Sequence, residues 1–131
     1  MVDDTESRDP RWKMIVCVPV TPEGLVDPRW GRADRVVIAT VGEAGIEDWQ
    51  EFDVGWDSLH DSGSEGSHHA RVARFLRDHE VEVVVAHHMG DGMRRMLEKM
   101  GLTVRLGEAG SARESATTAV GVDPDNGFPP R

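Results

Sequence analysis

Apolar and polar positions alternate along the chain in patterns that predict five strands. The segments 13–20 (KMIVCVPV) and 81–87 (VEVVVAH) are nearly continuous apolar runs rich in β-branched residues, which is typical of central strands buried on both faces. The segment 34–41 (DRVVIATV) predicts another strand, and 46–54 (IEDWQEFDV) alternates as a half-exposed edge strand does. The segment 102–106 (LTVRL) predicts a last, short strand.

Two segments show the spacing of apolar positions that indicates amphipathic helices. The segment 68–79 has one apolar face, and Ser67 stands in front of it as the expected N-cap. The segment 90–100 places methionines and a leucine at i, i+3, i+4 and i+7, and Gly101 follows at the expected C-terminal cap. The segment 111–120 predicts a weak terminal helix.

The predicted elements follow the order β-β-β-α-β-α-β, with a possible C-terminal helix. Short connections join the first three strands into an antiparallel meander, whereas the later strands arrive through helices and therefore pair in parallel. We expect the two most apolar strands to be neighbours at the centre of the sheet. The fold class predicted is α/β, with a mixed sheet of ribonuclease-H-like topology.

The two ends of the chain differ from its middle. Residues 1–11 are acidic and lack periodicity, and residues 121–131 are rich in glycine and proline. Both are therefore predicted to be flexible tails. The full length of 131 residues suits one domain, and we place that single domain at residues 12–120.

Composition removes several classes of protein. Lys and Arg number 15 and Asp and Glu 24, which gives a net charge of −9 and disfavours binding to nucleic acid or to anionic lipid. The single cysteine, Cys17, excludes an internal disulfide and a four-thiolate metal site within one chain. The chain has no long apolar run and begins with acidic residues, so we expect a cytoplasmic protein without a membrane partner.

Histidine is concentrated where the predicted topology brings three segments to one end of the sheet, the end at which ligands of open α/β sheets usually bind. Helical spacing turns His69 toward the sheet, with His68 nearer the edge of that face. One of the adjacent residues His87 and His88 can meet His69, and imidazole suits iron, zinc, copper or nickel. We predict these as metal ligands, with His68 and His60 as outer candidates. The alternative is that each is a polar residue at a helix start or strand end.

Two further motifs at the same end favour an anionic ligand. Gly90 and Gly92 flank an aspartate at a predicted helix start, where free N–H groups and the helix dipole attract anions. Arg29 and Arg32 flank Trp30 in the loop sequence DPRWGR, and arginine makes charge-assisted contacts to carboxylates and phosphates. The alternatives are a turn that serves packing only and a solvated loop in which Trp30 packs as a lid.

Taken together, these motifs resemble the dinitrogenase iron–molybdenum cofactor-binding family (the NifX, NafY and NifB C-terminal group). The family's His-Phe-Gly-Arg-Ala-like loop element corresponds to residues 29–33, and its Val-Asp-Val-Val-like strand to 81–84. Its Gly-x-Gly turn corresponds to 90–92, and its Leu-x-x-x-Gly-Ile helix end to 97–102. The resemblance spans about residues 13–106. It implies a ribonuclease-H-like fold that binds or carries an anionic metal–sulfur cluster without catalysis.

One position departs from the family pattern, because Arg29 stands where the family has its first-loop histidine. If that histidine holds the cluster, the histidines of the other segments could replace it, for a simpler metal. We therefore expect a non-catalytic carrier of a metal or of an iron–sulfur cluster of the iron–molybdenum type, as in nitrogenase cofactor biosynthesis. A cluster donor or acceptor protein is the expected partner.

Two other functions remain open at the level of the sequence. The same glycines and arginines could form a regulatory module that binds a small anion or a nucleotide without metal. A metal-dependent hydrolase is the third reading, and the lack of a well-placed carboxylate base disfavours it.

Overall fold

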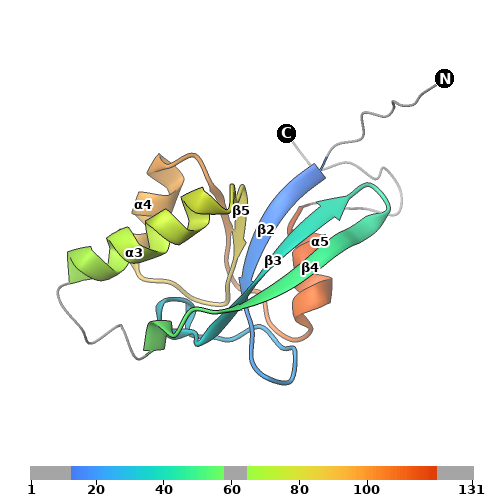
Figure 1. The fold of residues 1–131 in the computed structure, drawn as a ribbon, viewed down its shortest axis with the longest axis horizontal. Coiled ribbons are helices and arrows are strands. Elements are labelled where there is room, and N and C mark those ends of the chain that lie inside the picture. The colour runs from blue at the N-terminus through green and yellow to red at the C-terminus, as the bar shows by residue number, and fades with distance from the viewer. Residues whose placement is uncertain (1–12, 58–64, 121–131) are drawn as a thin grey trace.

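A five-stranded mixed sheet with helices on both faces forms the described part of the chain, residues 13–57 and 65–120 of a computed structural model (Figure 1). The order across the sheet is β4-β3-β2-β5-β6. β2 and β4 each pair antiparallel with β3, whereas β5 pairs in parallel with β2 and β6. The strands are β2 (Lys13–Pro19), β3 (Arg35–Gly42), β4 (Gly45–Asp53), β5 (Val83–Val85) and β6 (Thr103–Arg105).

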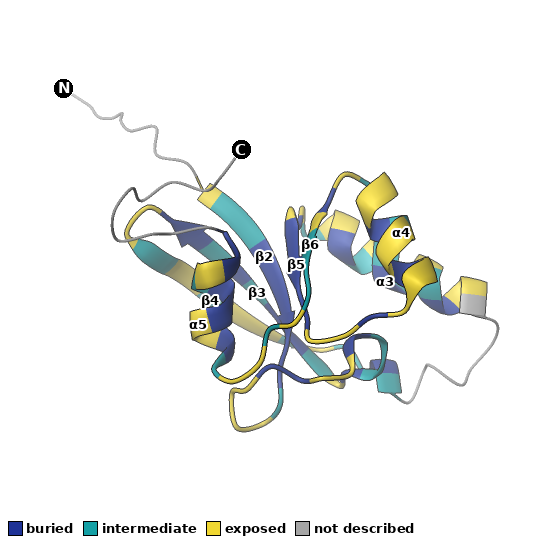
Figure 2. Ribbon diagram, turned by 180° about the vertical axis from the view of Figure 1, so that it is seen from behind, coloured by how far each residue is buried: buried dark blue, intermediate teal, exposed yellow. Residues whose placement is uncertain are grey.

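Helices α3 (Glu65–Asp78) and α4 (Asp91–Lys99) cover one face of the sheet, and α5 (Ala112–Ala119) covers the other (Figures 1 and 2). The predicted element order is thus confirmed, including the C-terminal helix. The two most apolar strands, β2 and β5, are neighbours at the centre, as their burial on both faces requires. The structure is an α/β fold with a mixed sheet.

Alternating side chains of β2 divide the core into two layers. Cys17 lies in the layer beneath α3 and α4, whereas Val16 and Val18 lie in the layer beneath α5. Burial raises the pKa of the Cys17 thiol far above its ordinary value, because an apolar interior disfavours the thiolate. The thiol therefore behaves as a small apolar core group.

Several predicted boundaries shift. The N-cap predicted at Ser67 is wrong, because α3 begins at Glu65 and Ser67 lies within its first turn. The strand predicted at 81–87 pairs only over Val83–Val85, since its neighbour β6 is itself only three residues long.

Some predictions fall on residues that the structure does not describe. The predicted tails at 1–11 and 121–131 and the middle of the loop after β4 lie outside the described residues. None of the helices in the described ranges has the length and apolarity needed to span a membrane.

Candidate functional site

A cavity of about 610 Å³ lies beyond the carboxyl ends of β2 and β5. Its walls come from three segments: the loop after β2, the first turn of α3, and the connection from β5 into α4. These are the segments that the predicted topology brings to one end of the sheet. The lining residues are Pro28, Arg29, Trp30, Gly31, Arg32, His68, His69, His88, Met89, Gly90, Asp91, Gly92 and Met93.

The predicted histidines divide into three groups. His68, His69 and His88 line the cavity. His87, at a bend after the end of β5, is exposed and does not line it. His60 lies outside the described residues. Within the described ranges, no group of three or more His, Cys, Asp or Glu side chains is arranged to hold a metal ion, so the ligand roles stay predictions.

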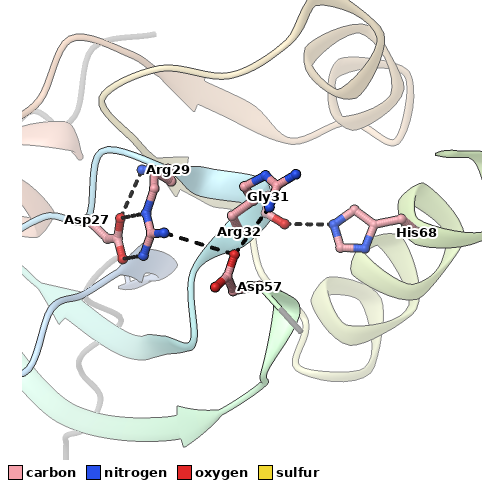
Figure 3. A network of polar contacts seen from close by, with 6 residues as sticks. All are labelled: Asp27, Arg29, Gly31, Arg32, Asp57 and His68. Carbon is pink, nitrogen blue, oxygen red and sulfur yellow. Dashed lines mark hydrogen bonds and ion pairs between the residues drawn. The ribbon is translucent and has the colours of Figure 1, made fainter. Parts of the chain in front are cut away.

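His68 is buried, with 3% of its surface exposed. Its Nε2 lies 2.8 Å from the Gly31 carbonyl oxygen (Figure 3). Nη1 of Arg71 lies 2.9 Å from its Nδ1. The sequence predicts His68 near the edge of the apolar helix face. In the structure, its side chain reaches from α3 to the loop after β2. This contact joins residues 37 positions apart, so no local pattern could have predicted it.

His69 is half-buried and lies against the first turn of α4. A Cβ built on Gly92 would lie 3.5 Å from Cε1 of the His69 ring. Neither Gly90 nor Gly92 has a positive φ angle, so the backbone of this turn does not itself require glycine. A side chain at position 92 would instead meet the imidazole of His69 in ordinary van der Waals contact.

The first turn of α4 faces the cavity without a side-chain cap. The N-cap residue is Gly90, and among the described residues no side chain caps the helix there. The first N–H groups of a helix have no partner within the helix, and they carry the positive end of its dipole. The predicted helix start is therefore present at this turn, and Asp91 in the same turn opposes an anion. Binding of an anion there stays a prediction.

The two arginines of the loop have carboxylate partners, which the sequence analysis did not identify (Figure 3). Arg29 donates from Nε to Oδ1 of the buried Asp27 at 3.3 Å, and Asp27 also accepts the Arg29 backbone N–H at 2.9 Å. The pKa of the Arg29 guanidinium is raised, first by this side-chain hydrogen bond and then by the charge of Asp27. Arg32 pairs with Asp57 at 3.3 Å. An anion in the cavity would compete with these carboxylates.

Trp30 is a core residue that also lines the cavity. It is 2% exposed, and its ring meets that of Trp56 edge to face at 5.3 Å between centroids. Its indole Nε1 is buried without a hydrogen-bond partner among the described residues. Trp30 therefore anchors the loop in the core, while the side chains of Arg29 and Arg32 on either side of it are exposed.

The fold and the cavity define a class of protein: a small mixed α/β domain with a candidate ligand site beyond the carboxyl ends of its central strands. The chain belongs to the dinitrogenase iron–molybdenum cofactor family, whose model matches residues 13–121. The resemblance seen in the motifs is thereby confirmed. The description of the family ties the chain, in general terms, to a metal cofactor.

Two solved structures are similar to the chain. The crystal structure of PH0822 has a TM-score of 0.62 and 17% identity, over 77% of this chain and 83% of that chain, which shows a shared fold. The apo form of the orange protein from Desulfovibrio gigas has a TM-score of 0.60 and 25% identity, over 77% of this chain and 82% of that chain. No curated protein matches the sequence.

Proposed function

We propose that the chain is a non-catalytic binding or carrier protein for a metal–sulfur cluster of the iron–molybdenum type. The single observation that carries this proposal is the cavity, where imidazoles and an uncapped helix start lie together. Family membership supports the same cargo. We place the protein in the cytoplasm, exchanging its cargo with a donor or acceptor protein and binding neither nucleic acid nor membrane.

The residues of the cavity fit such a cargo. His69 and His88 offer nitrogen ligands that suit iron. The first-turn amides of α4 can donate hydrogen bonds to anionic sulfide. Arg29 and Arg32 can reach the cargo by exchanging their partners Asp27 and Asp57. His87 remains the alternative ligand to His88, and His60 remains an outer candidate.

The sheet order supports a finer description of the fold. Three antiparallel strands followed by two parallel ones, in the order β4-β3-β2-β5-β6, are what we expect of a ribonuclease-H-like sheet. We propose that topology for this chain. The catalytic chemistry of that fold is not proposed, since function depends on the residues of a site and not on its fold.

The first test measures iron and acid-labile sulfide in untagged protein that is purified without oxygen. Wild-type protein should contain both, and the double variant His69→Ala/His88→Ala should lose most of both. The matched control is His79→Ala, since His79 packs on Phe52 and Phe75 away from the cavity. Unchanged iron in the double variant would contradict the proposal.

A second function is favoured by one observation, the uncapped start of α4 in the cavity wall. A small-anion or nucleotide-binding regulatory module would use these amides together with Arg29 and Arg32. It predicts that phosphate or nucleotides raise the melting temperature and that metals do not. The carboxylate partners of both arginines weigh against it.

A further inference from the structure

We infer that His68 is a positioning residue and not a metal ligand: through its hydrogen bonds with Gly31 and Arg71, it fixes the cavity wall formed by the 3-10 turn Trp30–Arg32. The inference rests on the proposed function of this cavity, and it assigns different roles to two adjacent histidines. His69 is assigned as a ligand of the bound metal cluster, whereas His68 is assigned to keep the turn Trp30–Arg32 in place.

The two hydrogen bonds fix the tautomer of the His68 ring. A guanidinium group has donors only, so Nδ1 must accept the bond from Arg71. The Gly31 carbonyl has acceptors only, so Nε2 must carry the proton and donate it. The ring is therefore neutral, and both of its nitrogens are engaged by the protein.

Metal binding by His68 would break one of these bonds. Coordination through Nδ1 would displace Arg71, and coordination through Nε2 would remove the proton that Gly31 accepts. The ring is also 3% exposed, whereas His88 is exposed and His69 is half-buried. Leaving a buried polar group without its partner is costly, so His69 and His88 are the better ligands.

The same contact explains how the wall keeps its shape. The turn Trp30–Arg32 has no side-chain cap at Arg29, and it is closed by the bond from Arg32 N–H to the Arg29 carbonyl at 3.0 Å. His68 connects the middle of this turn to α3 through its hydrogen bond to the Gly31 carbonyl (Figure 3). A Cβ on Gly31 would lie 3.6 Å from Nε2, so the loop approaches the ring closely.

Two amide substitutions separate positioning from ligation. In His68→Gln, the side-chain NH₂ takes the place of Nε2 and can still donate to Gly31. In His68→Asn, the shorter side chain can accept from Arg71 but cannot reach Gly31. Neither amide can replace an imidazole as a metal ligand. If His68 is a positioning residue, His68→Gln should therefore keep the hydrogen bond to Gly31 and the properties of wild type, whereas His68→Asn should lose both.

The first readout is the release of iron to a chelator from protein reconstituted anaerobically with ferrous iron and sulfide. We expect release from His68→Asn to be about tenfold faster than from wild type, as one lost hydrogen bond predicts. Release from His68→Gln should stay within about twofold of wild type, because the Gln side chain keeps the hydrogen bond to Gly31. Equal loss of iron in both variants would show that His68 is a ligand and would overturn the inference. Equal retention in both would also overturn it.

The second readout does not depend on cargo. Backbone amide exchange at Arg32 and Ala33 should become about tenfold faster in His68→Asn, the effect of one hydrogen bond, and should stay near wild type in His68→Gln. The amides of Val18 and Val37 in the central strands are the internal control, because their unchanged exchange shows that the variant folds. Identical exchange in both variants would contradict the positioning role.

A third readout is the nitrogen NMR spectrum of the histidine rings in wild type. It should place the proton of His68 on Nε2, and a proton on Nδ1 would overturn the assignment. The outcomes also separate the two proposals. If wild type takes up no iron, the proposed function fails, and amide exchange and the tautomer still decide the role of His68.

Discussion

His87 and His88 are adjacent in the chain, yet only His88 lines the cavity. His87 lies at a bend after the end of β5 and is exposed outside the cavity, so the site receives one imidazole of the pair. The pattern in the sequence predicts the opposition of the two rings but not which of them faces inward. That choice depends on how β5 sits beside β2.

The pair provides a matched test of the site. We expect His88→Ala to lower the iron content of reconstituted protein severalfold, because it removes an imidazole from the cavity. His87→Ala should leave the content near wild type, since His87 is exposed outside the cavity lining. Metal analysis of both variants decides the matter, and a greater loss in His87→Ala would assign the ligand role to the other histidine.

Gly92 gives a second residue-scale prediction. In Gly92→Ala the methyl group would lie 3.5 Å from Cε1 of His69, an ordinary contact that restricts rotation of the ring. Replacing glycine by alanine in a helical turn should stabilise the fold by about 0.5–1 kcal/mol. We therefore expect reduced iron uptake in a protein that is at least as stable as wild type.

Arg95→Ala is the control for that substitution, because Arg95 is exposed on the same helix and does not line the cavity. Iron titration and thermal unfolding of both variants test the prediction. Equal iron uptake in the two variants would show that the space beside His69 does not matter for the cargo.

At the scale of elements, α5 differs from the other two helices in how it packs. Its buried positions are small, Ala112, Ala116 and Ala119, and they lie on the valine-rich face of the sheet. Small side chains let the helix approach the sheet closely, and Ser111 caps its start by accepting the Glu114 N–H. A segment with weak helical periodicity thus becomes a stable helix through tertiary contact and a cap.

Overpacking this helix should destabilise the protein. Ala116→Leu places a large side chain where Ala116 is fully buried, and we expect a loss of about 1–3 kcal/mol in the free energy of unfolding. Thr118→Leu, on the exposed side of α5, should change it by less than about 0.5 kcal/mol. Urea unfolding measures both, and equal effects would mean that α5 does not pack as described.

At the scale of the whole molecule, the sheet separates two cores, and Cys17 lies in the one beneath α3 and α4. Burial raises the pKa of this thiol, whereas its pKa in the unfolded chain is about 8.5. Above that pH the unfolded state loses the proton first. Deprotonation therefore favours unfolding, and stability falls as pH rises.

This linkage can be measured by urea unfolding as a function of pH. Between pH 9 and 10, wild type should lose up to about 1.4 kcal/mol per pH unit from this thiol. Cys17→Val keeps an apolar side chain in the strand and should lose correspondingly less over the same range. Parallel pH curves for the two proteins would show that the thiol is not protected by burial.

The parts of the molecule that could be predicted are those that depend on interactions between residues close together in the sequence. The strands and α4 follow from local periodicity, since a strand buried on both faces must be apolar throughout. The family motifs were found by their resemblance to a known pattern. The predicted start of α3 was wrong, because the helix begins two residues before Ser67, at the polar residue Glu65. Helix ends depend on weak, competing local signals.

The sequence by itself determined the order of the elements, the central pairing of the two apolar strands, and the convergence of three segments, two of which carry histidines. Each of these follows from hydrophobic periodicity and the rules of chain connection. Only the tertiary structure decided that His68 bonds to Gly31 and that Arg32 pairs with Asp57. These contacts join residues 37 and 25 positions apart. They depend on angstrom-scale distances between separate elements, which a pattern of polar and apolar positions does not specify.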